Sequence, residues 1–207
     1  MKNALYIVDD HSIVRHGLKD WLEANSSWKV INTFTNSADC MKALETTLTQ
    51  DYPEIIIIDV QLIGETGFSL CKKLNEKYKA IKCVMYSMYD TPGYILQAKD
   101  SGAMGYISKV ASEQELVKCL EKVQKGEFYL EQKMIEAQTR LETITNIFSK
   151  QERLVFELIL QKKSNDDIVN ELFISNRTVE NYISRIYDKL DVKNRTELLQ
   201  KYGDVGK

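Results

Sequence analysis

The sequence lacks any apolar stretch close to the roughly 18 uninterrupted residues that a membrane helix needs. Its first ten residues carry one lysine and a short apolar run ending in two acids, a poor match to a signal peptide. We therefore expect no membrane partner and a cytoplasmic location. The net charge of −2 excludes a strongly basic coat protein, but it leaves room for a small local DNA-binding surface.

Residues that bind zinc or form disulfides are scarce. The four cysteines and two histidines show no C-x-x-C pair and no zinc-ligand spacing; they are Cys40, Cys71, Cys83, Cys119, His11 and His16. We expect reduced, mostly buried thiols and no structural zinc site. There is also no internal repeat and no low-complexity tract. The 207 residues, 43% hydrophobic and 28% charged, are typical of a globular chain with room for two ordinary domains.

Five short, apolar and mostly β-branched runs in the first part of the chain predict strands. They are Ala4–Val8, Trp28–Phe34, Ile55–Ile58, Cys83–Tyr86 and Gly105–Ile107. Helical patterns lie between and after them, and the first begins with Ile13, Leu18 and Leu22. Five such repeats predict a doubly wound α/β domain with a five-stranded parallel sheet over residues 1–125.

Polar residues follow four of these predicted strands. Asp9 and Asp10 end the first, Asp59 the third and Ser87 the fourth, and Lys109 follows the fifth. Sites in such sheets lie at the carboxyl ends of the strands, so we expect these side chains to meet.

Three converging carboxylates would repel one another, and Mg²⁺, which prefers oxygen ligands, is the usual remedy. Asp59 can then act as a nucleophile toward a phosphoryl group and form an acyl phosphate. Lys109 can supply a positive charge and Ser87 a hydroxyl hydrogen bond to that group.

The second part of the chain shows a different pattern. Residues 126–147 are polar and helix-compatible, which we interpret as a linker. Residues 148–207 predict four helices, with capping boxes beginning at Ser149 and Ser164. An apolar seam runs along the third helix at Val179, Ile183, Ile186 and Leu190. Four short helices with a tight turn between the second and third predict an all-α helix-turn-helix domain.

The first part resembles a response-regulator receiver domain, which has a flavodoxin-like fold. The matching segments are Val8–His11, Asp59–Leu62 with Gly67 beyond, Tyr86–Ser87 and Gly102–Lys109. The resemblance implies that Asp59 is phosphorylated by a sensor histidine kinase.

The same resemblance implies roles for neighbouring residues. Mg²⁺ would be bound directly by Asp10 and Asp59, through water by Asp9, and by the backbone carbonyl of Gln61. Lys109 would bind the phosphoryl group. Ser87 and Tyr106 would form a switch pair, with Ser87 turning toward the phosphoryl group and Tyr106 rotating inward.

Residues 148–201 resemble the LuxR-type helix-turn-helix of the NarL/FixJ class. The matching segments are Phe148–Glu152, Ser164–Ile168, Leu172–Ser175, Ile186–Leu190 and Asn194–Leu198. A recognition helix places its exposed face in the major groove. The candidate DNA contacts are Arg177, Thr178, Glu180, Asn181, Ser184, Arg185, Lys189, Lys193 and Arg195. Residues 148–207 hold 11 basic and 10 acidic residues, a weak electrostatic footprint for DNA binding.

Together these features predict a two-component response regulator. Phosphorylation would control sequence-specific binding to double-stranded DNA, and transcription, through a homodimer, with RNA polymerase as a further partner. It would not be an enzyme, beyond slow self-dephosphorylation. One alternative is an aspartate-nucleophile phosphohydrolase, but such enzymes usually carry an acid where Gln61 stands. Another is a receiver that works without phosphorylation.

Glu180 gives a prediction about DNA sequence preference, because a carboxylate repels phosphates but accepts a hydrogen bond from cytosine N4. Many related helices have Lys or another non-acidic residue there. Replacing Glu180 with Lys should change the preferred DNA sequence, measured by selection from a random DNA pool. An unaltered sequence preference would refute this interpretation.

Overall fold

The computed structural model describes residues 3–90, 92–136, 139 and 146–203. The chain divides into two compact units. The first comprises residues up to Asp90 together with Leu96–Glu131, and the second comprises the remainder. No helix among the described residues has the length and apolar character to span a membrane.

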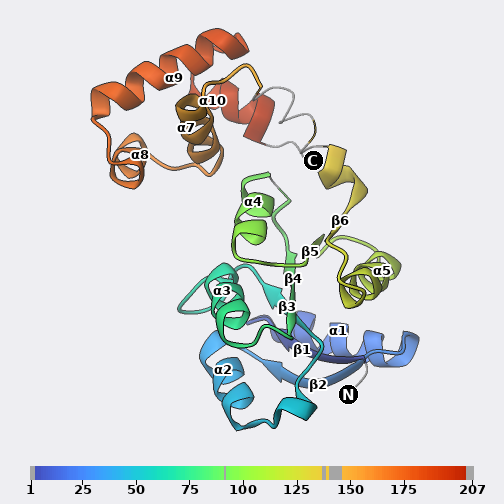
Figure 1. Cartoon of the computed structure of the whole chain (residues 1–207). Helices are drawn as coiled ribbons and strands as arrows, with labels where there is room; N and C mark the ends of the chain where they lie inside the picture. Colours follow the sequence, from blue (N-terminus) through green and yellow to red (C-terminus); the bar gives the residue numbers. More distant parts are fainter. Residues whose placement is uncertain (1–2, 91, 137–138, 140–145, 204–207) are drawn as a thin grey trace. The chain divides into compact units, whose positions relative to one another are not determined.

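The first unit is built on a parallel sheet of six strands in the order β2-β1-β3-β4-β5-β6 (Figure 1). The strands are β1 (Ala4–Val8), β2 (Lys29–Phe34), β3 (Ile55–Asp59), β4 (Lys82–Ser87), β5 (Gly105–Ser108) and β6 (Tyr129–Leu130). Every residue of β1 and β3 is buried, as expected for central strands covered on both faces. The prediction of a doubly wound parallel α/β domain is confirmed.

Helices cover both faces of this sheet (Figure 1). They are α1 (Ser12–Asn25), α2 (Ser37–Thr46), α3 (Gly67–Lys77), α4 (Pro92–Asp100) and α5 (Glu113–Gln124), with a short 3₁₀ turn, η1 (Thr49–Asp51). One core cluster joins alternate residues of β1 and β3 to α1 and α5. The helices α2 and α3 contact β2, β3 and β4, and Figure 1 shows them on the opposite face. All four cysteines are buried free thiols, as predicted.

The predicted strand count of five is wrong, because β6 adds a sixth strand at the edge of the sheet. Tyr129 and Leu130 pair in parallel with Gly105 and Tyr106. This strand lies within the range predicted as a linker. Two residues are too short for an alternating pattern to reveal, so only the neighbouring β5 identifies them as a strand.

The second unit is helical, with α7 (Lys150–Leu160), α8 (Asn165–Leu172), α9 (Asn176–Leu190) and α10 (Arg195–Leu198), followed by a π-helical turn, η2 (Leu199–Gly203). The capping boxes at Ser149 and Ser164 form as predicted. The seam of α9 is buried against α7 and α8 in one apolar cluster that includes the fully buried Phe156. The predicted four-helix domain with a tight α8–α9 turn is confirmed.

The loop from β3 to α3 folds tightly over the end of β3. The Gly67 N–H donates to the Val60 carbonyl at 2.8 Å. A Cβ atom at Gly67 would lie only 2.0 Å from the backbone oxygen of Asp59. The glycine is therefore needed for close approach of two backbone segments, and this approach sets the position of Asp59.

Replacing Gly67 with Ala should lower the free energy of unfolding by about 2 kcal/mol, because backbone rather than a movable side chain blocks the methyl group. Urea denaturation would measure the loss. The matched control is Gly17→Ala in α1, where an added Cβ meets nothing within 4 Å. Equal stabilities for the two variants would contradict this account.

Candidate functional site

An acidic cluster lies at the carboxyl edge of the sheet of the first unit. Asp9 and Asp10 follow β1, and Asp59 ends the neighbouring strand β3, so the pairing of these strands brings the three together. One oxygen of each carboxylate and one ring nitrogen of His11 all lie within 4.8 Å of one another. Asp9 is only 1% exposed and Asp59 only 5%. Buried negative charges at this separation require compensation.

Lys109, directly after β5, supplies part of that compensation. Its Nζ atom lies 2.7 Å from Asp59 Oδ2 and 2.8 Å from Asp9 Oδ2. Burial alone would lower the pKa of Lys109, but its hydrogen bonds and charge attraction to Asp59 and Asp9 raise the pKa overall. The Lys109 side chain is therefore a cation in this site.

The Asp59 carboxyl responds to opposing influences. Burial raises its pKa, the hydrogen bond and charge of Lys109 lower it, and the nearby charge of Asp9 raises it again. The net result is a raised pKa. One lysine is thus insufficient to compensate the burial and repulsion of these carboxylates.

The donor set fits a divalent cation. Asp9 Oδ2 and Asp10 Oδ1 are buried and accept no hydrogen bond of favourable geometry among the described residues. Each nevertheless lies 2.8 Å from a nitrogen, of Lys109 and of His11 respectively. Carboxylate oxygens that are buried without hydrogen-bond donors are suited to coordinating a hard cation.

Two residues near the cluster escaped the sequence reasoning. The Nδ1 atom of His11 lies 2.8 Å from Asp10 Oδ1, and the position of this histidine immediately after two acids was the available signal. Arg15, one turn into α1, is buried and donates a guanidinium hydrogen bond to the backbone carbonyl of Asp9. Nothing in the apolar pattern of α1 marks an arginine as buried.

The predicted switch residues converge on Tyr89. Ser87, at the end of β4, is buried, and its Oγ atom accepts the Tyr89 N–H at 3.1 Å. Tyr106 on β5 is fully buried, and its hydroxyl donates to the Tyr89 carbonyl. The side chain of Tyr106 therefore already lies inside this unit. The resemblance had implied that it would rotate inward on phosphorylation.

Gln61, the predicted backbone ligand, lies in the loop after β3. Its N–H donates to Asp59 Oδ1 at 3.4 Å, and the residue forms an isolated antiparallel bridge with Thr66. The bridge keeps the backbone of Gln61 beside the acidic cluster.

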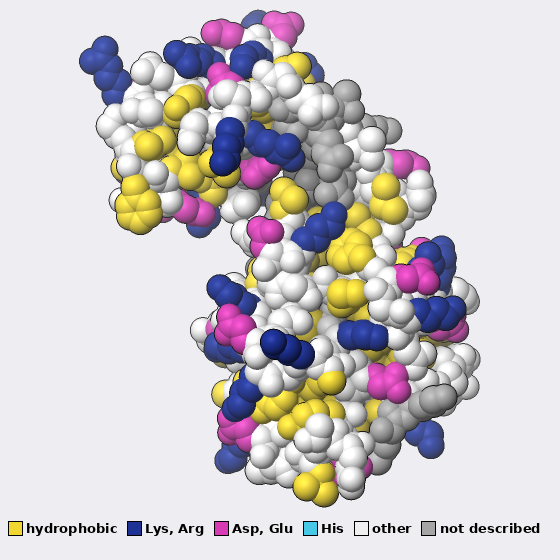
Figure 2. Space-filling view, viewed as in Figure 1, with side chains coloured by type: hydrophobic (Ala, Val, Ile, Leu, Met, Phe, Trp, Pro, Cys, Tyr) yellow, Lys and Arg dark blue, Asp and Glu magenta, His cyan; other side chains and the backbone are white. Residues whose placement is uncertain are grey.

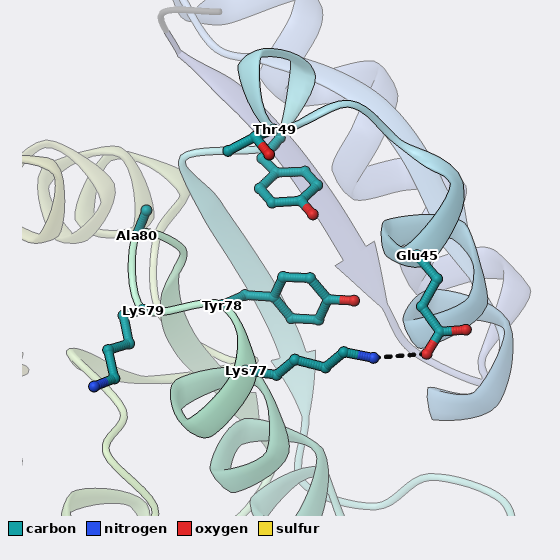
Figure 3. Close-up of a pocket in the computed structure, with 7 residues that line it drawn as sticks. Glu45, Thr49, Lys77, Tyr78, Lys79 and Ala80 are labelled. Atoms are coloured by element: carbon teal, nitrogen blue, oxygen red, sulfur yellow. Dashed lines mark hydrogen bonds and ion pairs between the residues drawn. The ribbon is translucent and has the colours of Figure 1, made fainter.

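A surface pocket of about 520 Å³ lies away from this cluster (Figure 3). It is lined by residues of α2, of η1 and the residue after it, of the last turn of α3, and of the segment that connects α3 to β4. Both connecting segments lead into the amino ends of β3 and β4. The Lys77 ammonium and the Glu45 carboxylate form an ion pair of 2.7 Å beside it. The pocket is thus at the amino end of the strands, opposite the acidic cluster.

The helix α9 of the second unit presents a polar face. Val179, Ile183, Ile186 and Leu190 are buried as the predicted seam. The candidate DNA contacts that lie exposed on α9 or just after it are Arg177, Glu180, Asn181, Ser184, Arg185, Lys189 and Lys193. On the visible face of this unit, basic and acidic side chains are interspersed (Figure 2). Recognition by this helix would thus depend on individual side chains more than on a basic surface.

Three candidate DNA contacts make hydrogen bonds or ion pairs inside the second unit. Lys189 forms an ion pair of 2.7 Å with the buried carboxylate of Glu152. Arg195 donates to the Asn165 side chain and to the Lys163 carbonyl. The hydroxyl of Thr178 shares a hydrogen bond with that of the N-cap residue Ser175.

The contacts of Lys189 and the Ser149 cap account for the charge state of Glu152. The hydrogen bond from Lys189, with those from Ser149, lowers the pKa of Glu152 to about 2. Lys189 therefore helps to hold a buried carboxylate in its ionised form.

Comparisons with known proteins agree with this two-part organisation. The sequence model of the response regulator receiver domain matches residues 5–121, and that of the bacterial regulatory proteins of the luxR family matches residues 146–202. The chain is 31% identical to the oxygen regulatory protein NreC of Staphylococcus haemolyticus, covering 95% of this chain and 94% of that protein. It is 28% identical to the DNA-binding transcriptional activator DevR/DosR of Mycobacterium tuberculosis, covering 93% and 90%.

Two solved structures have a similar fold. RcsB of Salmonella enterica serovar Typhimurium, bound to promoter P1flhDC in the presence of the phosphomimetic BeF₃⁻, gives a TM-score of 0.67 at 22% identity and covers all of both chains. The response regulator ChrA of a heme-sensing two-component system gives 0.55 at 27% identity, covering 96% of this chain and 94% of that one.

The contacts of Lys189 generate a prediction that separates stability from DNA binding. Replacing Lys189 with Met leaves the buried carboxylate of Glu152 without its cation, and should lower the stability of the second unit by about 1 kcal/mol, since the lysine is itself partly exposed. Thermal unfolding would measure this loss.

The matched comparison is Arg185→Met on the exposed face of α9. It should leave stability unchanged and reduce the slope of log affinity against log salt concentration by about one, as expected for a lost phosphate contact. A reversed pattern, with Lys189 controlling the salt slope and Arg185 the stability, would contradict this assignment.

Proposed function

Because the chain belongs to the response regulators, with a receiver domain followed by a LuxR-family DNA-binding domain, we propose that Asp59 accepts a phosphoryl group from a sensor histidine kinase. Phosphorylation then controls binding of the second unit to specific DNA sequences. The observation that carries the proposal is the position of Asp59 at the end of β3, beside Lys109 and two further carboxylates.

In the transfer step, a carboxylate oxygen of Asp59 attacks the phosphorus of the kinase phosphohistidine. A P–O bond forms, the P–N bond breaks, and the imidazole leaves with the electron pair. The ammonium of Lys109, already 2.7 Å from Asp59, is placed to stabilise negative charge on the phosphoryl oxygens. The two family matches are to a response regulator receiver domain and to bacterial regulatory proteins. The one catalytic activity that we propose is slow self-dephosphorylation by water.

The residues suited to hold Mg²⁺ are the carboxylates of Asp10 and Asp59 and the backbone carbonyl of Gln61, with Asp9 acting through water. Two buried carboxylate oxygens without well-aligned hydrogen-bond donors support this assignment. When bound, the ion would neutralise charge on the phosphoryl oxygens. The residues of the chain orient the acceptor carboxylate and keep it largely out of bulk water.

The switch that we propose involves the backbone of Tyr89. Ser87 and Tyr106 each hold one polar group of that residue. A phosphoryl group on Asp59 offers the Ser87 hydroxyl a charged acceptor, which forms a stronger hydrogen bond than a neutral one. As Ser87 turns toward it, the Tyr89 N–H loses its partner, and the loop after β4 is released to rearrange while Tyr106 stays inside.

On the DNA side, we propose that the exposed face of α9 enters the major groove. Glu180, Asn181 and Ser184 are placed to contact base edges, and Arg177, Arg185 and Lys193 to contact phosphates. Lys189, Arg195 and Thr178 contribute mainly to the structure of the unit, through the contacts described above.

The proposed assembly is a homodimer that forms on phosphorylation, because two copies can read two half-sites of DNA. RNA polymerase is the further partner of a transcription regulator of this kind. We place the protein in the cytoplasm because chromosomal DNA in bacteria lies there.

The test of the proposed function is selection of bound fragments from a random DNA pool with Mg²⁺, in the presence and absence of beryllofluoride as a phosphoryl stand-in. A two-half-site motif should be enriched mainly when beryllofluoride is present. Enrichment that is equal in both arms would mean that the chemistry of Asp59 does not control DNA binding.

The control is Asp59→Asn, which keeps the size of the side chain and removes the nucleophile. It should take up no phosphoryl group and should give the same selection with and without beryllofluoride. A beryllofluoride response that survives in this variant would place the acceptor elsewhere.

A further inference from the structure

The backbone that carries Lys109 is held firmly on one side of β5. The Lys109 N–H donates to the Ser87 carbonyl of the neighbouring strand β4 at 2.7 Å. Ser87 is itself a proposed switch residue. The position from which the Lys109 ammonium reaches Asp59 is therefore fixed, on this side, by the sheet.

On the other side of β5 the sheet stops early. The strand β6 pairs only with Gly105 and Tyr106 and ends at Leu130 (Figure 1). Successive N–H groups of a strand point to opposite sides, so the Ser108 N–H points away from β4, toward the side of β6. Without another acceptor it would be a buried N–H with no partner, which costs free energy.

Glu131 supplies that acceptor. It follows β6 directly, is only 6% exposed, and its Oε1 atom accepts the Ser108 N–H. A carboxylate is costly to bury, and a neutral acceptor would satisfy a backbone N–H. A charged acceptor at this point forms a stronger hydrogen bond and holds the end of β5 more firmly. The receiver family match ends at residue 121, before Glu131.

We propose that Glu131 is a positioning residue for Lys109. The end of β5 is then held by two hydrogen bonds, from the Lys109 N–H to the Ser87 carbonyl on one side and from the Ser108 N–H to the Glu131 carboxylate on the other. The proposal rests on the proposed function, in which the Lys109 ammonium binds the phosphoryl group. The side chain of Lys109 must then shift from Asp9 and Asp59 toward the phosphoryl oxygens, and the two hydrogen bonds limit how far its backbone moves with it.

The same residue connects this site to the chain that leads toward the DNA-binding domain. Glu131 is the last residue of the first compact unit, and the chain from Gln132 onward belongs to the second. A displacement of Ser108 and Lys109 on phosphorylation would pull on Glu131 and so on the segment that follows it. Glu131 thus acts in two ways, in holding Lys109 and in passing its movement onward.

The experiment titrates beryllofluoride with Mg²⁺ into the full-length protein and into Glu131→Ala and Glu131→Gln, measuring heat of binding. The alanine variant loses the acceptor, so half-saturation should need more beryllofluoride, up to about fivefold, the limit set by the free energy of one net hydrogen bond. Glutamine should give an intermediate affinity, because its amide oxygen can accept the same N–H but, being neutral, forms a weaker hydrogen bond than the carboxylate. The matched control, Glu127→Ala, removes an exposed glutamate that pairs with Lys122 at 3.6 Å, and should leave affinity unchanged.

A second readout is the gain in DNA affinity that saturating beryllofluoride produces, measured for each variant on the sequence selected above. The gain should be smaller for Glu131→Ala than for the unchanged protein and the Glu127→Ala control. Thermal unfolding of each variant distinguishes positioning of Lys109 from a purely structural role. A purely structural role would lower the midpoint temperature of unfolding but leave the beryllofluoride affinity and the gain in DNA affinity unchanged.

Such a purely structural result would overturn the proposal, as would equal weakening in the alanine and glutamine variants. Failure of the unchanged protein to bind beryllofluoride through Asp59 is a different outcome. It would refute the proposed function itself, and the role of Glu131 with it.

Discussion

Repulsion among three carboxylates at the carboxyl edge of a parallel sheet is the constraint on which the first unit depends. Pairing of β1 with β3 makes the crowding unavoidable, because Asp9 and Asp59 end neighbouring strands. Lys109 provides one positive charge at 2.7–2.8 Å, and Arg15 brings a second to the backbone of Asp9. Two cations against three carboxylates leave one negative charge uncompensated. That excess favours binding of a divalent cation. Under the proposed function, the cation would also offset the negative charge of an incoming phosphoryl group.

Compensation of this kind requires the cations to be held in position. A flexible lysine side chain stabilises a partner well only when its backbone is already fixed, since otherwise ordering the chain costs conformational entropy. The end of β5 is fixed by hydrogen bonds to Ser87 and Glu131, and Tyr89 is held by Ser87 and Tyr106. The acceptor site and the loops around it therefore share hydrogen bonds, so a change of charge at Asp59 reaches more than one strand.

In the second unit, different residues of α9 contribute to stability and to the proposed DNA recognition. The apolar seam of α9 and the pair of Lys189 with Glu152 hold the helices together. The remaining candidate DNA contacts on the exposed face of α9 are few and carry charges of both signs. This agrees with the near-zero net charge of residues 148–207. Under the proposed function, affinity from counterion release would therefore be modest, and specificity would come from contacts with base edges and from the use of two half-sites.

The sequence by itself determined the five longer strands, the helical domain with its capping boxes, and the convergence of Asp9, Asp10, Asp59 and Lys109. Each of these is encoded locally, in hydrophobic periodicity or in a polar residue at the end of an apolar run. Only the tertiary structure decided that β6 joins the sheet, that Arg15 and Glu131 are buried, and that Lys189 pairs with Glu152. It also left Ile13 86% exposed although its spacing resembles that of the core residues of α1. These outcomes depend on which segments become neighbours across the fold, and no local pattern carries that information.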